Sequence, residues 1–233
     1  MKPQLREELR ALFAKLANWS NTLIYILGLL LYALGVNLLV KAELGVSPLS
    51  SLAYVIACIT GLRLSVTLFD FNLVVLLVQR LTLGKQFEQT QYLQILANLM
   101  FSVCVDATLP LAALFSPATL FSRGMLLAAG MAALALGVTL VKEADILMLS
   151  GDGIGRVIHL KTGMHFGTAK MLNDCLTGGA AAAVSLIFLG DIIGIQGGTI
   201  IAAVGVGIMA KHLGILLQSH IRTFTACGVS ESP

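Results

Sequence analysis

Long apolar runs constrain this sequence more than any other feature. An α-helix needs about 20 mostly apolar residues to cross roughly 30 Å of membrane hydrocarbon. Only 12% of the 233 residues are charged, about half the share in a typical soluble domain. We therefore predict an all-α membrane protein with about six transmembrane helices, over residues 21–40, 64–83, 91–109, 119–141, 168–189 and 198–217. The third helix is expected to stop at Pro110, because proline breaks the helical hydrogen-bond pattern.

The polar and sulfur-containing residues exclude several classes of protein. The net charge of +3 is small and the basic residues are spread along membrane-flanking segments. The lipid bilayer, and not nucleic acid, is therefore the expected partner. Neither the four cysteines nor the four histidines have the spacing of a metal site. No nucleophile–base pair or phosphate-binding loop is visible, so we expect no metal, no cofactor and no enzymatic activity.

An internal repeat divides the chain. Residues 33–61 align without gaps to residues 135–163, a shift of 102, and ten of the 29 positions are identical. The matches include two glycines and a threonine as well as aliphatic residues (Gly35/Gly137, Gly61/Gly163 and Thr60/Thr162). Chance similarity between two Leu- and Ala-rich helices is the alternative. The repeat predicts two copies of one three-span unit.

The two copies are predicted to be inverted in the membrane. Because each copy has an odd number of spans, the second must enter the membrane in the opposite orientation. Twelve Lys and Arg residues fall on one side of this arrangement, and only Lys41, Arg63 and Arg123 fall on the other. Since Lys and Arg gather on the cytoplasmic side, both termini are predicted to be cytoplasmic. The expected divisions are an amphipathic N-terminal segment, two repeats and a cytoplasmic tail (1–20, 21–114, 115–217 and 218–233).

One loop carries a family resemblance. The segment VKAELGVSPLSSL, residues 40–52, is followed by the Thr60-Gly61 pair. At these residues the chain resembles the YczE/YyaS/YitT group of bacterial membrane proteins, and the resemblance extends over about residues 25–217. It implies a bacterial inner-membrane protein but no settled activity, so it assigns no site residues. The second copy reads ILMLSGDG over residues 146–153 and departs from the LGVSP pattern.

A short segment follows the first span of each copy, apolar at residues 48–60 and amphipathic at residues 151–162. About 13 residues cannot cross a bilayer, so each segment is either re-entrant or lies at the membrane interface. Ser47 followed by Pro48 predicts a helix start there, and a free helix N-terminus favours an anion or a carboxylate. We therefore name Ser47, Ser150 and Asp152 as candidate substrate-binding residues. The alternative is that both segments are capped connecting helices.

Polar residues inside the spans are further candidates for substrate binding. Asp70 and Asn72 lie in the second span, and Asn173 and Asp174 lie at a similar depth in the fifth. A carboxylate at mid-membrane costs on the order of 3 kcal/mol, so it usually faces a cavity or a partner. These side chains can hold a proton, a sodium ion or a substrate amine. Alternatively they reach the headgroups, or Asp174 pairs with Lys170 one helical turn away.

Uncharged polar residues and small residues allow two interpretations each. Asn37 in the first span is a candidate for substrate binding, but Asn37 and Asn98 can also simply bond to a neighbouring helix. Runs of Gly and Ala at residues 178–183 and 205–207 permit close helix packing. They suit seams in the core or the face of a homodimer.

Together these features favour a small secondary transporter that works by alternating access. Inverted repeats are a recurring plan of such proteins, with the ligand site near the membrane midplane between the halves. The expected substrate is a small polar or anionic metabolite, coupled to protons or sodium. Two alternatives stay open, a substrate-binding membrane subunit of a larger uptake complex and an accessory membrane factor for a biosynthetic enzyme.

Overall fold

The computed structural model describes residues 10, 15–164 and 166–227. Within this range, residues 85, 156, 159, 166, 167, 170 and 218–227 are described by their backbone alone. The amphipathic segment predicted over residues 1–20 therefore lies largely outside the described part of the chain.

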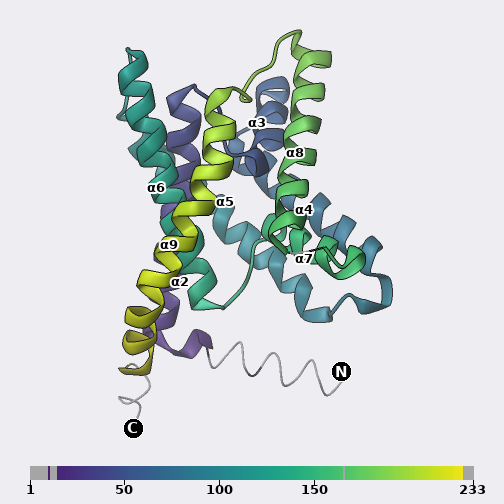
Figure 1. Cartoon of the computed structure of the whole chain (residues 1–233), viewed down its shortest axis with the longest axis vertical. Helices are drawn as coiled ribbons and strands as arrows, with labels where there is room; N and C mark the ends of the chain where they lie inside the picture. The colour runs from purple at the N-terminus through teal and green to yellow at the C-terminus, as the bar shows by residue number, and fades with distance from the viewer. Residues whose placement is uncertain (1–9, 11–14, 165, 228–233) are drawn as a thin grey trace.

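All the elements of the described residues are helical (Figure 1). Six of the helices are long and apolar enough to cross a membrane, which confirms the prediction of about six spans. In chain order the elements are α2 (Trp19–Ala42), α3 (Pro48–Thr60), α4 (Leu64–Leu83), η1 (Gly84–Gln86), η2 (Gln89–Leu93), α5 (Gln94–Ala113), α6 (Leu120–Ala144), α7 (Ser150–Thr162), α8 (Phe166–Leu189) and α9 (Gly197–Cys227).

The prediction that Pro110 ends the third span is wrong. Helix α5 continues through Pro110 to Ala113. A proline in the last turn removes only one backbone hydrogen bond, to the carbonyl four residues earlier. The turn that follows Pro110 is kept because Leu114 and Phe115 donate to the carbonyls of Leu111 and Ala112.

The two repeats have matching local structure at the predicted shift of 102 residues. Helices α3 and α7 begin and end at equivalent positions. The helices before them end at equivalent residues with left-handed backbone, Glu43 and Asp145. Thr60 and Thr162 each donate to the carbonyl four residues earlier and accept from the N–H two residues later. The non-aliphatic matches in the repeat therefore correspond to shared backbone features.

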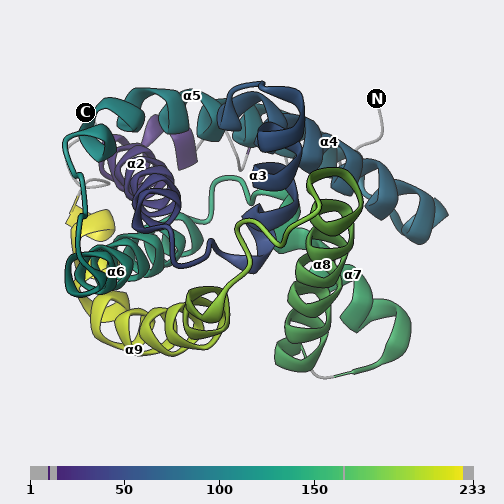
Figure 2. The same cartoon turned by 90° about the horizontal axis from the view of Figure 1, so that it is seen from above.

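Helices α2 and α6 lie side by side and run antiparallel (Figures 1 and 2). Arg123, in the first turn of α6, pairs with Glu43 at the end of α2 at 2.9 Å. Asn21, in the first turn of α2, donates to the carbonyl of Ala144 at the end of α6 at 2.9 Å. The first turn of each helix therefore contacts the end of the other, through the equivalent residues Asn21 and Arg123.

Glycines allow these two backbones to approach closely. A Cβ placed on Gly35 would lie 2.5 Å from the backbone nitrogen of Leu134. The close approaches come in reciprocal pairs of equivalent positions, Gly28 with Val141, Gly130 with Leu39, Gly35 with Leu134, and Gly137 with Tyr32. The contacts advance on one helix as they retreat on the other, as packing of antiparallel helices requires.

The helices form two bundles that cut across the repeats. In the first bundle, α2 packs against α5 and α6, and α6 packs against α9; in the second, α3 and α7 each pack against α4 and α8. Contacts between α4 and α5 join the two bundles. Figure 2 shows the first bundle beside the second. Each repeat thus gives its first and third long helices to one bundle, and its short helix and second long helix to the other.

Apolar side chains cover much of the outer surface of the long helices. On α9 they include Ile200, Ile201, Val204, Ile208, Ile215 and Leu216, all exposed. A water-soluble protein rarely exposes so continuous an apolar face. This surface fits contact with lipid.

Candidate functional site

The two short helices meet by their N-terminal ends at the centre of the molecule. A Cβ on Gly151, near the start of α7, would lie 2.8 Å from Cδ2 of Leu49 near the start of α3. Leu49 and Gly151 are equivalent positions in the sequence repeat. Helix α3 occupies the upper part of Figure 1 and α7 the lower part. Helix dipoles of both repeats therefore point towards one central region.

Three amide side chains of the first repeat hold the start of α7. Asn98 donates to the hydroxyl of Ser150 at 2.7 Å and accepts from the Ser150 N–H at 3.2 Å. Asn72 accepts from the N–H of Gly151 at 3.0 Å. Gln79 donates to the Ser150 carbonyl at 2.8 Å. These bonds satisfy polar groups that a buried helix start would otherwise leave without partners.

The start of α3 is held differently. Ser47 occupies the N-cap position, as predicted, but its side chain makes no capping bond. Instead, the loop before α3 is bonded through its backbone to the connection between α8 and α9. The N–H of Val46 donates to Gly194 and the N–H of Gly198 donates to Leu44, both at 2.9 Å.

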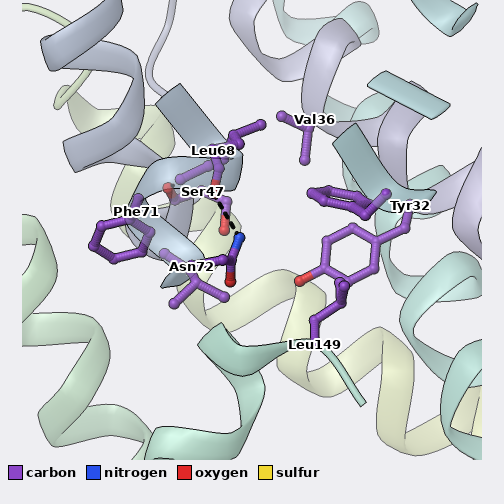
Figure 3. Close-up of a pocket in the computed structure, with 10 residues that line it drawn as sticks. Tyr32, Val36, Ser47, Leu68, Phe71, Asn72 and Leu149 are labelled. Atoms are coloured by element: carbon purple, nitrogen blue, oxygen red, sulfur yellow. Dashed lines mark hydrogen bonds between the residues drawn. The ribbon is translucent and has the colours of Figure 1, made fainter. Parts of the chain in front are cut away.

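A small cavity lies beside the meeting point, between the two bundles (Figure 3). It leaves about 20 Å³ for the centres of water-sized molecules, which is room for about one water. In Figure 3 the Tyr32 hydroxyl points across the cavity towards Asn72. The lining residues are Tyr32, Val36, Ser47, Leu49, Ser50, Leu68, Phe71, Asn72, Phe101 and Leu149.

Two carboxylates of the second repeat lie near Tyr32, Asp152 on α7 and Asp174 on α8. Asp152 lies in the first turn of α7, where the helix dipole favours a negative charge. Among the described residues, no three His, Cys, Asp or Glu side chains lie close enough to hold a metal ion.

A larger cavity of about 450 Å³ lies on the other side of Leu149. It is bounded by α6, by α9 and by the start of α7 with the residues just before it. Leu149 lines both cavities and is only 3% exposed, so its side chain separates them. The lining residues are Val138, Thr139, Val141, Lys142, Glu143, Met148, Leu149, Asp152, Gly207, Ala210, Lys211, Gly214 and Ile215.

The structure brings most of the predicted binding residues together at this centre. Ser47 and Asn72 line the small cavity, Asp152 lines the large one, and Ser150 is fully buried between α4, α5 and α7. Asp174, on α8, lies near Tyr32. Four of these five residues lie on helices of the α3/α4/α7/α8 bundle: Asn72, Ser150, Asp152 and Asp174. The fifth, Ser47, occupies the N-cap position of α3.

Three predicted binding residues lie elsewhere. Asp70 is exposed on α4 and lines neither cavity. Asn173 is buried on α8 but also lines neither. Asn37 donates to the Val105 carbonyl at 2.8 Å and to the Thr108 hydroxyl at 3.0 Å, so it bonds between α2 and α5.

The sequence interpretation missed Tyr32, Gln79 and Leu149 as residues of the centre. Gln79 had a readable signal, since an amide deep in an apolar span needs a partner. Tyr32 and Leu149 had none, because an aromatic or aliphatic residue is ordinary in a membrane helix.

The comparisons place the chain in a family without giving it an activity. The model of a family described as "Family of unknown function (DUF6198)" matches residues 19–214, and the chain belongs to that family. No curated protein and no solved structure matches the chain.

Proposed function

We propose that this member of a family of unknown function is a small secondary transporter of the bacterial inner membrane. It moves a small polar or anionic metabolite by alternating access of two inverted repeats, and both termini are cytoplasmic. The reciprocal contacts of α2 with α6 support the inversion, and the excess of Lys and Arg on one side supports the orientation. The resemblance at LGVSP to the YczE/YyaS/YitT group agrees with the location and adds no activity.

The observation that carries this proposal is an asymmetry between equivalent positions. Three residues of the large cavity, Val138, Leu149 and Asp152, have their equivalents in Val36, Ser47 and Ser50. Those equivalents line the small cavity. The two cavities thus share three equivalent positions, yet one encloses about 450 Å³ and the other about 20 Å³. An inverted-repeat transporter that is open to one side and closed to the other has this arrangement.

Helix α5 is also packed more tightly than its equivalent α9. On α5, Val105, Thr108 and Ala112 are at most 4% exposed. Their equivalents on α9 are Gly207, which is exposed, and Ala210 and Gly214, which are half-buried. Asn37 bonds α2 to α5 at 2.8 and 3.0 Å, whereas its equivalent Thr139 reaches the Ala210 carbonyl of α9 only at 3.4 Å. The side of the first repeat is therefore closed and the side of the second is open.

The large cavity faces the cytoplasmic side in the proposed orientation, since Lys142 and Lys211 lie towards the cytoplasmic ends of α6 and α9. The conformation is then the inward-open one. The small cavity lies between the two bundles, and the large cavity lies between α6, α9 and the start of α7. In this proposal the moving bodies are the bundles and not the repeats themselves. Movement of α3/α4/α7/α8 against α2/α5/α6/α9 would close the large cavity and open the small one.

Reconstitution into liposomes tests the transport. Metabolite pools are screened for uptake driven by a proton or a sodium gradient. We expect uptake by the purified protein alone. Uptake that appears only when a partner protein is added would favour the subunit of a larger complex. Absence of uptake under both conditions would favour an accessory factor for an enzyme.

Cysteine labelling tests the alternation. In a background without the four native cysteines, equivalent positions are compared through Met148→Cys and Val46→Cys. Met148 is 40% exposed and Val46 is 2% exposed, so a membrane-impermeant thiol reagent should label only the first, from the cytoplasmic side. Under conditions that drive uptake, the labelling of Val46→Cys from the opposite side should rise. Uptake during which Val46→Cys never reacts would contradict alternating access.

A further inference from the structure

The described chain passes between the two bundles at four connections. Two of them lie in the upper half of Figure 1, residues 43–47 between α2 and α3 and residues 190–196 between α8 and α9. The other two lie in the lower half, residues 84–93 between α4 and α5 and residues 145–149 between α6 and α7. Each half of the molecule therefore has one pair of connections that a movement of the bundles must displace.

The two upper connections are bonded to each other through their backbones. The N–H of Val46 donates to the carbonyl of Gly194 at 2.9 Å. The N–H of Gly198, in the first turn of α9, donates to the carbonyl of Leu44 at 2.9 Å. Among the described residues, no backbone hydrogen bond joins the two lower connections. The bundles are therefore fastened together by their connections in the upper half alone.

Glycine allows the upper connections to approach this closely. A Cβ on Gly45 would lie 2.4 Å from Oγ1 of Thr199, and the backbone there has a φ of +123°. A Cβ on Gly198 would lie 2.4 Å from the carbonyl oxygen of Leu44. At the shift of 102, leucine replaces both glycines in the lower half (Gly45/Leu147 and Gly198/Leu96). The difference between the two halves is therefore present in the sequence.

Hydroxyl groups at both ends fix the shape of the α8–α9 connection. Ser185, near the end of α8, donates to the carbonyl of Asp191 at 2.6 Å and accepts from the N–H of Ile193 at 2.9 Å. Thr199, in the first turn of α9, donates to the carbonyl of Gly194 at 3.2 Å. Both hydroxyl-bearing residues are at most 4% exposed. Internal bonds at both ends allow this connection to move as one body.

The contact lies beside the small cavity, because Val46 precedes Ser47, which lines that cavity. We propose that residues 43–47 together with residues 190–199 form the external gate of the protein, which opens when the two connections separate. Each backbone bond changes such an equilibrium about two- to tenfold, so two bonds hold the gate closed and still permit opening. This proposal adds a gate to the proposed transporter and rests on that function in placing the contact on the external side.

Two adjacent glycines provide a matched pair of variants. A Cβ at Gly198 would lie 2.4 Å from the Leu44 oxygen, whereas a Cβ at Gly197 would meet no atom within 4 Å. The full chain without its four native cysteines carries Val46→Cys as the reporter, in liposomes. Gly198→Ala should raise the rate of labelling from the external side about tenfold, and Gly197→Ala should leave it unchanged. Equal rates in the two variants would overturn the gate.

A second pair of variants adds no bulk to the contact. Thr199→Val keeps the shape of the side chain and removes the hydroxyl that bonds to Gly194, whereas Thr199→Ser keeps the hydroxyl. Because one hydrogen bond changes an equilibrium about two- to tenfold, Thr199→Val should raise the labelling of Val46→Cys by such a factor. Thr199→Ser should leave the labelling unchanged. A rise in both variants or in neither would contradict the role of this connection.

Met148→Cys, on the side of the large cavity, distinguishes a gate from a local weakening. Because the two sides of an alternating-access transporter open in turn, Gly198→Ala should lower the labelling of Met148→Cys from the cytoplasmic side. Raised labelling of Val46→Cys with unchanged labelling of Met148→Cys would overturn the gate, since the contact would then cover Val46 without affecting the other side.

The outcomes separate this proposal from the transporter itself. Opposite changes of labelling at Val46→Cys and Met148→Cys in Gly198→Ala, together with no uptake by liposomes, would keep the gate and refute the transport. Gradient-driven uptake, with labelling of Val46→Cys equal in all four variants, would refute the gate and keep the transport.

Discussion

At the scale of single residues, polar side chains in the spans serve the fold before they serve any substrate. Asn72 was predicted to bind substrate because it lies in an apolar helix. In the structure it lines the small cavity and also caps α7, by accepting from the N–H of Gly151 at 3.0 Å. Its amide group donates to the carbonyl of Leu68 in its own helix at 2.8 Å. A buried amide that satisfies a helix start fixes the place of that start, which positions Asp152 two residues later.

Removal of one capping amide should destabilise the protein. Asn98→Ala leaves the N–H and the hydroxyl of the buried Ser150 without their partner, and an unsatisfied buried polar group costs about 1–3 kcal/mol. We expect that loss in the free energy of unfolding, measured by reversible denaturation in detergent micelles. The exposed Asp70 provides the control, because Asp70→Asn should change stability by no more than about 0.5 kcal/mol. Equal losses in the two variants would contradict the capping role.

Tyr32 should matter more for transport than for stability. Tyr32→Phe keeps the ring, including its contact with Phe101 at a centroid distance of 4.9 Å, and removes only the hydroxyl that points across the small cavity towards Asn72 (Figure 3). Loss of one polar group costs about 1 kcal/mol, so the protein should stay folded. Gradient-driven uptake should fall by about tenfold. A variant that unfolds at the same denaturant concentration and transports at the normal rate would refute the link between Tyr32 and transport.

At the scale of helices, hydropathy and the internal repeat predicted the helices better than the sequence predicted the residues of the site. The length of the apolar runs located six spanning helices, and the Ser47–Pro48 pair located the start of α3. The same patterns could not show that the two short helices meet end to end. That contact depends on how closely Leu49 and Gly151 approach each other, which is a property of two distant segments together. Gln79, Tyr32 and Leu149 were missed for the same reason.

The close contact of α2 with α6 should depend on glycine at equivalent positions. A Cβ at Gly35 would lie 2.5 Å from the Leu134 nitrogen, and backbone atoms cannot move aside cheaply. Gly35→Ala should therefore destabilise the protein by about 1–3 kcal/mol. Gly124→Ala, in α6 with no atom within 4 Å of the new Cβ, should instead stabilise it by about 0.5–1 kcal/mol, since alanine favours helix. Opposite signs in unfolding measurements would confirm the contact, and equal signs would refute it.

At the scale of the whole molecule, the departures from symmetry are as informative as the symmetry. In the sequence repeat, α2 corresponds to α6 and α3 to α7, yet the structure holds one cavity of about 450 Å³ and one of about 20 Å³. The sequence itself is asymmetric at several of the compared positions, and one of them is Asn37 against Thr139. An amide that makes two bonds between helices favours closure of its side over a hydroxyl that makes one long bond. The conformation seen here is therefore the one that the sequence should favour.

Exchange of these two side chains should move the molecule towards its other conformation. In Asn37→Thr/Thr139→Asn, the bonds from Asn37 to α5 are lost, and an amide becomes available to bond α6 to α9. Hydrogen bonds contribute about 0.5–1.5 kcal/mol each, and a net difference of about 1.4 kcal/mol changes the ratio of two conformations about tenfold. Labelling of Met148→Cys from the cytoplasmic side should then fall and that of Val46→Cys should rise. Thr139→Asn alone tests the contribution of the cytoplasmic side, and labelling that stays the same in both variants would show that these bonds do not set the balance.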